Sequence, residues 1–234
     1  MSDQTQTATA ETTATAATVA ATTAPSQRLW EAITAGHDLP LYGLADGAAN
    51  AYIHAHLQVH NVPHLALYKD KGLPEEQSPW LFPLTQKETF SEWYLQESPA
   101  QYWGILLATA LPLVKLADHL RNYLTMQDEQ GKLHLMRFYD PRVTNAYLDA
   151  LTAQQRQGFF KPGLQLWTDA PGQGHTLLHY LEANSFEDNR LENKNLENNS
   201  QQPNSHYRRT PIDLRTNAQA AAEAQACDEG DCAC

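Results

Sequence analysis

Short apolar runs alternate with helical patterns through the middle of the chain. Between these runs, apolar residues recur every three or four positions, which is typical of a helix with one buried face. The alternation predicts a single α/β domain with a mixed sheet flanked by helices. A helix between the first two strands predicts a parallel crossover. The runs of strand length are residues 39–45, 64–68, 80–84, 102–107 and 164–167.

Polar segments flank this pattern on both sides. Residues 1–26 are mostly Thr and Ala with no Lys or Arg, and residues 184–234 form an Asn-rich linker followed by a Cys-ended tail. Both segments have too few apolar residues for a core, so we expect them to be disordered. The folded domain is therefore predicted at residues 27–183. The first segment lacks the basic start and apolar run of a secretory signal, so we expect the protein in the cytoplasm.

Charge and cysteine usage exclude several classes of function. The net charge is −11, which disfavours nucleic acid as the main partner. No stretch approaches the roughly 20 apolar residues of a membrane span. The three cysteines, Cys227, Cys232 and Cys234, all lie in the last eight positions, so none can form a disulfide within the core. They could bind a soft metal or form a disulfide, but an exposed, redox-labile tail is favoured.

Paired histidines are the main alternative to a non-catalytic function. His56 and His60, and again His175 and His179, are spaced so that both imidazoles would lie on one helix face, as in zinc sites. A metal-dependent hydrolase using these pairs is therefore the rival hypothesis. The metalloprotease motif is absent because no Glu follows His56, and no nucleophile or phosphate-binding motif occurs. We expect no catalytic residue, no metal and no cofactor.

The residues around Arg137 give a stronger indication of a functional or structural site than the paired histidines do. Arg137 alternates with Leu133, Leu135 and Tyr139 in a predicted hairpin strand over residues 132–139, so its side chain should point to a buried face. A buried guanidinium must be paired, and the candidate partners are Asp46 and Asp140. The pair is either structural, which is slightly favoured, or a rigid polar patch that docks a partner.

Three helix starts are predicted from capping residues. Asp140, followed by Pro141, should begin one helix. Capping boxes are predicted at residues 85–88 and 152–155.

Tryptophans are the candidate anchors for a protein partner. Trp103 lies on a predicted central strand, where core packing is the stronger interpretation. Trp93 belongs to the buried stripe of a predicted helix. Trp80 follows a Pro-containing loop, so it is the residue that we expect to be exposed and to bind a partner.

One segment resembles the signature of the type VI secretion adaptor-chaperones, the Tap or Tec proteins: Arg137-Phe138-Tyr139-Asp140-Pro141-Arg142-Val143. Other segments follow in the order of that family, so the resemblance covers about residues 28–168. They are residues 42–48, 67–68, 80–84, 102–105, 113–124, 157–160 and 164–167.

The resemblance implies a function that composition alone does not show. Proteins of this kind are cytoplasmic chaperones that hold a toxic effector and load it onto the VgrG spike protein, without catalysis or cofactor. The effector, the face that binds it and the oligomeric state are left open. The residues expected to bind partners or to form the structural signature are Asp46, Trp80, Trp103, Arg137, Tyr139, Asp140 and Arg142.

Overall fold

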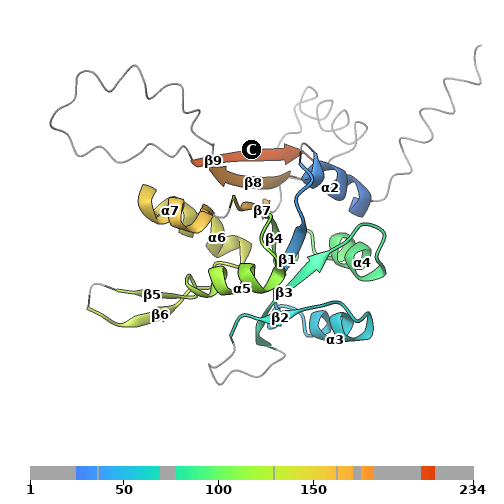
Figure 1. Cartoon of the computed structure of the whole chain (residues 1–234), viewed down its shortest axis with the longest axis horizontal. Helices are drawn as coiled ribbons and strands as arrows, with labels where there is room; N and C mark the ends of the chain where they lie inside the picture. Colours follow the sequence, from blue (N-terminus) through green and yellow to red (C-terminus); the bar gives the residue numbers. More distant parts are fainter. Residues whose placement is uncertain are drawn as a thin grey trace, which may run out of the picture.

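The computed structural model describes residues 25–35, 37–68, 77–128, 130–161, 163–170, 175–181 and 207–213 (Figure 1). Of the segments predicted to be disordered, residues 1–26 and 184–234, residues 1–24, 184–206 and 214–234 lie outside these ranges, and the three cysteines are among them. The helices are α2 (Pro25–Thr34), α3 (Tyr52–Val59), α4 (Thr89–Glu97), α5 (Leu113–Arg121), α6 (Pro141–Ala150) and α7 (Ala153–Phe160). The strands are β1 (Leu41–Asp46), β2 (Leu65–Ala66), β3 (Pro79–Leu84), β4 (Gly104–Ala108), β5 (Thr125–Gln127), β6 (Leu133–Leu135), β7 (Gln165–Ala170), β8 (His175–Leu181) and β9 (Tyr207–Asp213).

Seven strands form one sheet in the order β2-β3-β1-β4-β7-β8-β9, and β5 pairs with β6 in a separate hairpin. The α/β class is thus confirmed. The pairings between described strands are antiparallel. The crossover through α3 does join two strands of the same direction, but β3 lies between them. The physical reason is burial: β3 is buried along most of its length, whereas β2 has two half-buried residues that suit an edge.

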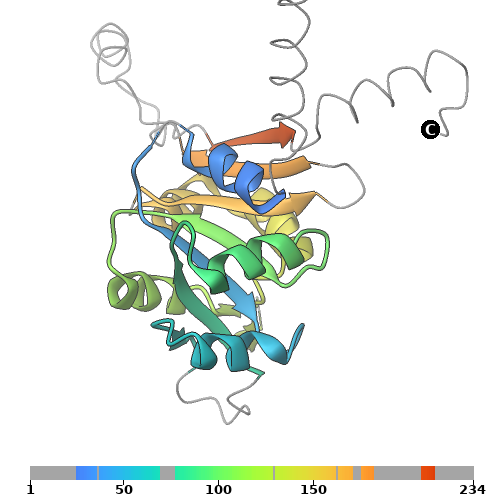
Figure 2. The ribbon, with the colours of Figure 1, turned by 90° about the vertical axis from the view of Figure 1, so that its right-hand side faces the viewer.

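Helices cover both faces of the sheet. Figure 1 shows α5, α6 and α7 on one side and α2, α3 and α4 on the other, and Figure 2 views the second side. Because successive strand residues point to opposite faces, each strand contributes to both cores. In β1, for example, Leu44 belongs to the first core and Ala45 to the second.

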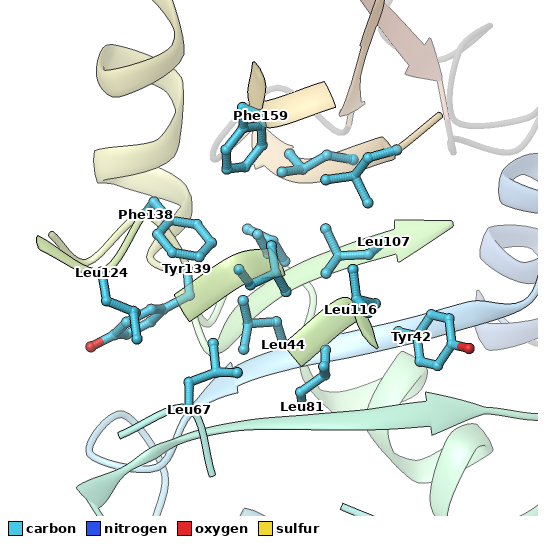
Figure 3. Packing of buried hydrophobic residues seen from close by; sticks show 14 of the residues in the cluster. Tyr42, Leu44, Leu67, Leu81, Leu107, Leu116, Leu124, Phe138, Tyr139 and Phe159 are labelled. Carbon is cyan, nitrogen blue, oxygen red and sulfur yellow. The ribbon is translucent and has the colours of Figure 1, made fainter. Parts of the chain in front are cut away.

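The first core lies beneath α5, α6 and α7 (Figure 3). Leu44, Leu81 and Leu107 come from three neighbouring strands and are fully buried. Leu116 of α5 covers them, and Phe159 of α7 closes the far end of the cluster. None of the described helices is long and apolar enough to cross a membrane.

The second core, under α2, α3 and α4, contains a group of contacting aromatic rings. Phe82 of β3 contacts Phe90 and Tyr94 of α4 edge to face, with ring centroids 5.1 Å apart in both pairs. Trp80 and Trp167 are buried in the same cluster. Edge-to-face geometry places the positive edge of one ring against the negative face of the next, which stabilises the packing beyond its buried area.

The last strand corrects the predicted domain boundary. Residues 207–213, which the sequence analysis placed in a linker, pair with β8 as the edge strand β9. Thr168 donates to Asn145 Oδ1, so its hydroxyl accepts from His179 Nε2 (2.9 Å), and His179 Nδ1 accepts from the Tyr207 hydroxyl (2.7 Å). Burial, helped by nearby Arg209, lowers the pKa of His179 to about 4, which keeps the imidazole neutral for this arrangement.

The helix caps match the local predictions at two of three sites. Asp140 caps α6 with Pro141 in the first turn, and Thr152 forms a reciprocal capping box with Gln155 at α7. The box predicted at residues 85–88 is wrong, because Glu88 takes the N-cap position of α4 without a side-chain cap bond.

Candidate functional site

Two acids and two arginines meet where β1 ends and α6 begins. Asp46 is the last residue of β1, and Asp140 is the N-cap of α6. Arg137 lies 91 positions from Asp46 in the sequence and forms an ion pair with it. We call the group of Asp46, Arg137, Asp140 and Arg142, with the ring of Tyr102, the Arg–Asp cluster.

Asp46 is held by the turn that follows β1. Its side chain is only 3% exposed, and Oδ1 accepts the backbone N–H of Ala48 (3.0 Å) while Oδ2 accepts Arg137 Nη2. The backbone N–H of Asp46 donates to the carbonyl of Trp103 (2.7 Å). The bond from Ala48 fixes the carboxylate and the bond to Trp103 fixes the backbone of Asp46, so the Arg137 guanidinium meets a preformed acceptor.

Arg137 is paired as predicted, but it is not buried. Its side chain is 48% exposed, and Nη2 lies 3.8 Å from Asp140 Oδ2 besides contacting Asp46. Burial lowers the pKa of Arg137, but the charge and hydrogen bond of Asp46, with the nearby Tyr139 and Asp140, together outweigh burial and raise that pKa overall. The prediction of a buried side chain was wrong because Leu133 and Leu135, which share its alternation, are themselves exposed, and β6 ends at Leu135, before Arg137. Arg137 lies instead in a turn, in which Asp140 N–H donates to Arg137 O (2.9 Å).

Asp140 is the second buried carboxylate, with a side chain 5% exposed. It accepts from the backbone N–H of Arg142 (3.1 Å) and bidentately from the Arg142 guanidinium, at 2.9 Å from Nε and 2.7 Å from Nη2. Burial raises the pKa of Asp140, but the hydrogen bonds and charge of Arg142 outweigh burial and lower it overall. Both acids are therefore covered by guanidinium groups that face solvent.

Tyr102 completes the cluster and was missed by the sequence analysis. The guanidinium carbon of Arg142 lies 4.8 Å from the centre of its ring, in a cation–π contact. Residues 102–107 were predicted as a strand, but β4 begins at Gly104 and Tyr102 has a left-handed φ of 56°. Ala100, also left-handed, donates its N–H to Asp169 Oδ2 (2.8 Å), which anchors the loop. A positive φ outside glycine leaves no reliable signal in one sequence.

Phe138 and Tyr139 anchor the signature segment in the first core. Figure 3 shows both rings among the buried side chains, near Leu124. Tyr139 is 3% exposed and contacts Tyr68 edge to face, with ring centroids 6.4 Å apart. Burial raises the pKa of the Tyr139 hydroxyl. Tyr139 therefore holds the segment in place, while Arg137 and Arg142 form its outer surface.

The prediction that Trp80 is exposed was wrong. Trp80 is 2% exposed and stacks on His54 of α3, with ring centroids 4.1 Å apart. Trp103 is half-buried, and its ring centroid lies 5.5 Å from that of Trp93. The backbone carbonyl of Trp103 contacts the cluster, since it accepts the N–H of Asp46. Trp80 was expected at the surface because of the neighbouring loop, but α3 covers it.

The first histidine pair lies at the end of α3 with its rings adjacent, and the second lies on a strand. His56 stacks on Trp93 with ring centroids 3.9 Å apart, and its ring centroid lies 5.8 Å from that of His60. His175 and His179 lie on β8 rather than on a helix. Among the residues that the structure describes, no group of three or more His, Cys, Asp or Glu side chains is arranged to hold a metal ion.

The comparisons with known proteins identify a family. The family described as "Domain of unknown function (DUF4123)" matches residues 41–158, half of the chain. The chain belongs to the DUF4123 family. No curated protein and no solved structure matches it. The DUF4123 match runs from β1 into α7, so it includes every residue of the Arg–Asp cluster.

The cluster of this DUF4123 protein has the chemistry of a rigid recognition surface. Its carboxylates accept hydrogen bonds on both oxygens, so neither is set up as a general base. Its guanidinium groups are fixed by those bonds and retain exposed edges. A fixed, half-exposed guanidinium is suited to bind a carboxylate or a carbonyl oxygen of another molecule.

Replacing Arg137 with glutamine should reveal how strongly the cluster depends on this residue. Asp46 would keep a buried charge without its partner, so we expect the free energy of unfolding to fall by about 2–3 kcal/mol. The loss should stay below that of a fully buried pair, because half of the Arg137 side chain is exposed and water can reach it. Urea denaturation of the purified variant measures this change.

The Asp46→Asn/Arg137→Gln double variant tests whether the unpaired charge of Asp46 causes the loss of stability. It removes both charges, so it should recover at least half of the loss. Arg209→Gln is the matched control, because its partner Asp149 is about half exposed, and it should change stability by less than about 1 kcal/mol. An Arg137→Gln variant as stable as this control would show that the ion pair contributes nothing.

Proposed function

We propose that this DUF4123 protein is a type VI secretion chaperone and adaptor, which binds a toxic effector and loads it onto the VgrG spike protein. The proposal rests on the resemblance of residues 137–143 to the adaptor-chaperone signature. The observation that carries it is how these residues are arranged: Tyr139 is buried as an anchor, while Arg137 and Arg142 cover two buried carboxylates and face solvent. A surface built in this way supports binding rather than catalysis.

The remaining parts of the proposal follow from that role. The protein works in the cytoplasm before firing, needs no cofactor or metal, and performs no chemical step. Its partners are the effector and VgrG, and neither nucleic acid nor a membrane takes part. The rival, a metal-dependent hydrolase, is less well supported, since His56 stacks on Trp93 and His179 is bonded to Thr168 and Tyr207.

Co-purification with the products of neighbouring genes tests the proposal. The full chain is expressed in one mixture with the effector and in a second mixture with the VgrG protein, each encoded beside its gene. Each mixture is separated by size exclusion. We expect a complex that survives the column, which requires an interface above about 1,000 Å². Elution of the full chain alone in both mixtures would overturn the adaptor function.

A further inference from the structure

The loop that joins α4 to β4, residues 98–103, has a strained backbone. Ala100 and Tyr102 have φ angles of 60° and 56°, in the left-handed region. A residue with a Cβ atom is crowded against its own backbone there, so it keeps this conformation only where contacts with the surrounding structure hold it. The strain is released whenever those contacts weaken. We call residues 98–103 the α4–β4 loop.

Two contacts hold the strained residues of the α4–β4 loop in place. Ala100 N–H donates to Asp169 Oδ2 on β7 (2.8 Å). The ring of Tyr102 lies 4.8 Å from the guanidinium carbon of Arg142. Ala100 and Gln101 are themselves exposed, so the loop lies at the surface and can move without disturbing either core. The loop therefore connects Asp169 with the Arg–Asp cluster through three consecutive residues.

Asp169 lies in a site that does not balance its charge. It borders a cavity of about 20 Å³, which is too small for bulk water. No Lys, Arg or His is among the described residues that line this cavity. Tyr94 is the other titratable residue there, and burial, followed by the charge of Asp169, raises the pKa of its hydroxyl. The neighbouring elements contribute neutral side chains: Leu29 of α2, Ser98 of the loop, Leu106 of β4 and Thr176 of β8.

These surroundings make the protonation of Asp169 depend on the loop. Burial raises the pKa of Asp169 from 3.8 to about 6, and the hydrogen bond from Ala100 offsets this only in part. When the loop moves away, water reaches the carboxyl group and its ordinary pKa returns. The closed loop therefore holds the proton more tightly than an open loop does. As the pH rises through about 6, the equilibrium shifts towards the open loop.

We propose that the α4–β4 loop is a pH-sensitive switch, in which ionisation of Asp169 opens the loop and takes the ring of Tyr102 away from Arg142. The protonated acid still has an oxygen that accepts the Ala100 N–H, so the loop stays closed. The ionised acid gains water when the loop opens, and the backbone strain is released in the same step. Arg142 then keeps its bonds to Asp140 but loses the ring beneath it, so the surface of the Arg–Asp cluster changes with pH.

Amide hydrogen exchange of the full chain, followed by NMR, tests the switch. The protection factor of the Ala100 N–H, corrected for the intrinsic pH dependence of exchange, should fall about tenfold between pH 5 and pH 7. The N–H of Leu116, which donates to the carbonyl of Pro112 at the start of α5, is the internal control and should keep its protection. In Asp169→Asn, which keeps an acceptor oxygen but cannot ionise, the fall should vanish. Asp118→Asn, at a side chain 57% exposed, should retain it.

The Nε–H resonance of Arg142 reports whether the loop and the cluster are coupled. It should shift over the same pH range in the unaltered protein and stay constant in Asp169→Asn. A constant protection factor for Ala100 in the unaltered protein overturns the inference, and so does a fall that persists in Asp169→Asn. A response of Ala100 without one of Arg142 also overturns it, because the loop would then move independently of the cluster.

The unaltered protein decides the question if Asp169→Asn does not fold. The carboxyl carbon of Asp169 is then titrated by NMR beside the Ala100 amide. A common midpoint at about pH 6 supports the switch. A carboxyl midpoint near the ordinary value of 3.8 overturns it, since the acid would then be ionised throughout the range in which the loop is expected to open.

Discussion

Replacing Trp80 with alanine is expected to lower the free energy of unfolding by about 3–5 kcal/mol. Trp80 is 2% exposed, packs in the second core, and has the imidazole of His54 stacked on its face. Removing the indole would leave a cavity between β3 and α3 that the two layers cannot close without moving α3. Chemical denaturation of the purified variant measures the change.

An exposed aromatic residue of the same region provides the control for Trp80. Tyr52, at the start of α3, is 71% exposed, and Tyr52→Ala should alter stability by less than about 0.5 kcal/mol. Effector capture by Trp80→Ala should be lost only to the extent that the protein unfolds. If the variant keeps full stability but loses effector binding, Trp80 is an interface residue, and the structure has its side chain in the wrong place.

Replacing Gly104 with alanine should be comparably severe, with a loss of about 3 kcal/mol or more. A Cβ atom at Gly104 would lie 2.1 Å from the carbonyl oxygen of Leu44 and 2.7 Å from the Cα of Ala45. Both neighbours are backbone atoms of the paired strand β1, so no side-chain rotation can relieve the clash. The two central strands would have to separate where β1 leads into Asp46.

Gly158 offers the matched control. It lies in α7, and a Cβ there would make an ordinary contact, 3.4 Å from the Tyr123 hydroxyl. Gly158→Ala should therefore be neutral or stabilise by up to about 1 kcal/mol, because alanine is the better helix former. Thermal melts of the two variants compare them directly. Equal melting temperatures would show that β1 and β4 are less tightly apposed than described.

Features set by neighbouring residues could be predicted from the sequence. Alternating apolar patterns located most strands, and the caps at Asp140 and Thr152 depend on bonds within a few residues. An ion pair of Arg137 with Asp46 or Asp140 was also predicted, because a guanidinium expected on a buried face needs an acid, and the pairing is observed although the burial is not.

Features set by distant residues could not be predicted. The position of β3 between β1 and β2 depends on which strands bury both faces, and no local pattern encodes that order. Trp80 follows a loop in the sequence, yet α3 covers it. Residues 207–213 have the composition of a polar linker, and only the hydrogen bond between Tyr207 and His179 identifies them as part of the sheet. Arg137 kept its predicted partners but not its burial, since the β5–β6 hairpin has no layer packed over Leu133 and Leu135, and both of these residues are exposed.

The pairing of β8 with β9 makes the sheet tolerant of length changes in the chain between them. Leu181 and Tyr207 are direct partners, so the two ends of residues 182–206 are fixed at one cross-strand spacing. Closing such a connection has an entropic cost that grows only logarithmically, by about 0.6 kcal/mol for each doubling of its length. We therefore expect insertions or deletions between Leu181 and Tyr207 to change the stability of the domain little, as long as Tyr207 keeps its hydrogen bond to His179.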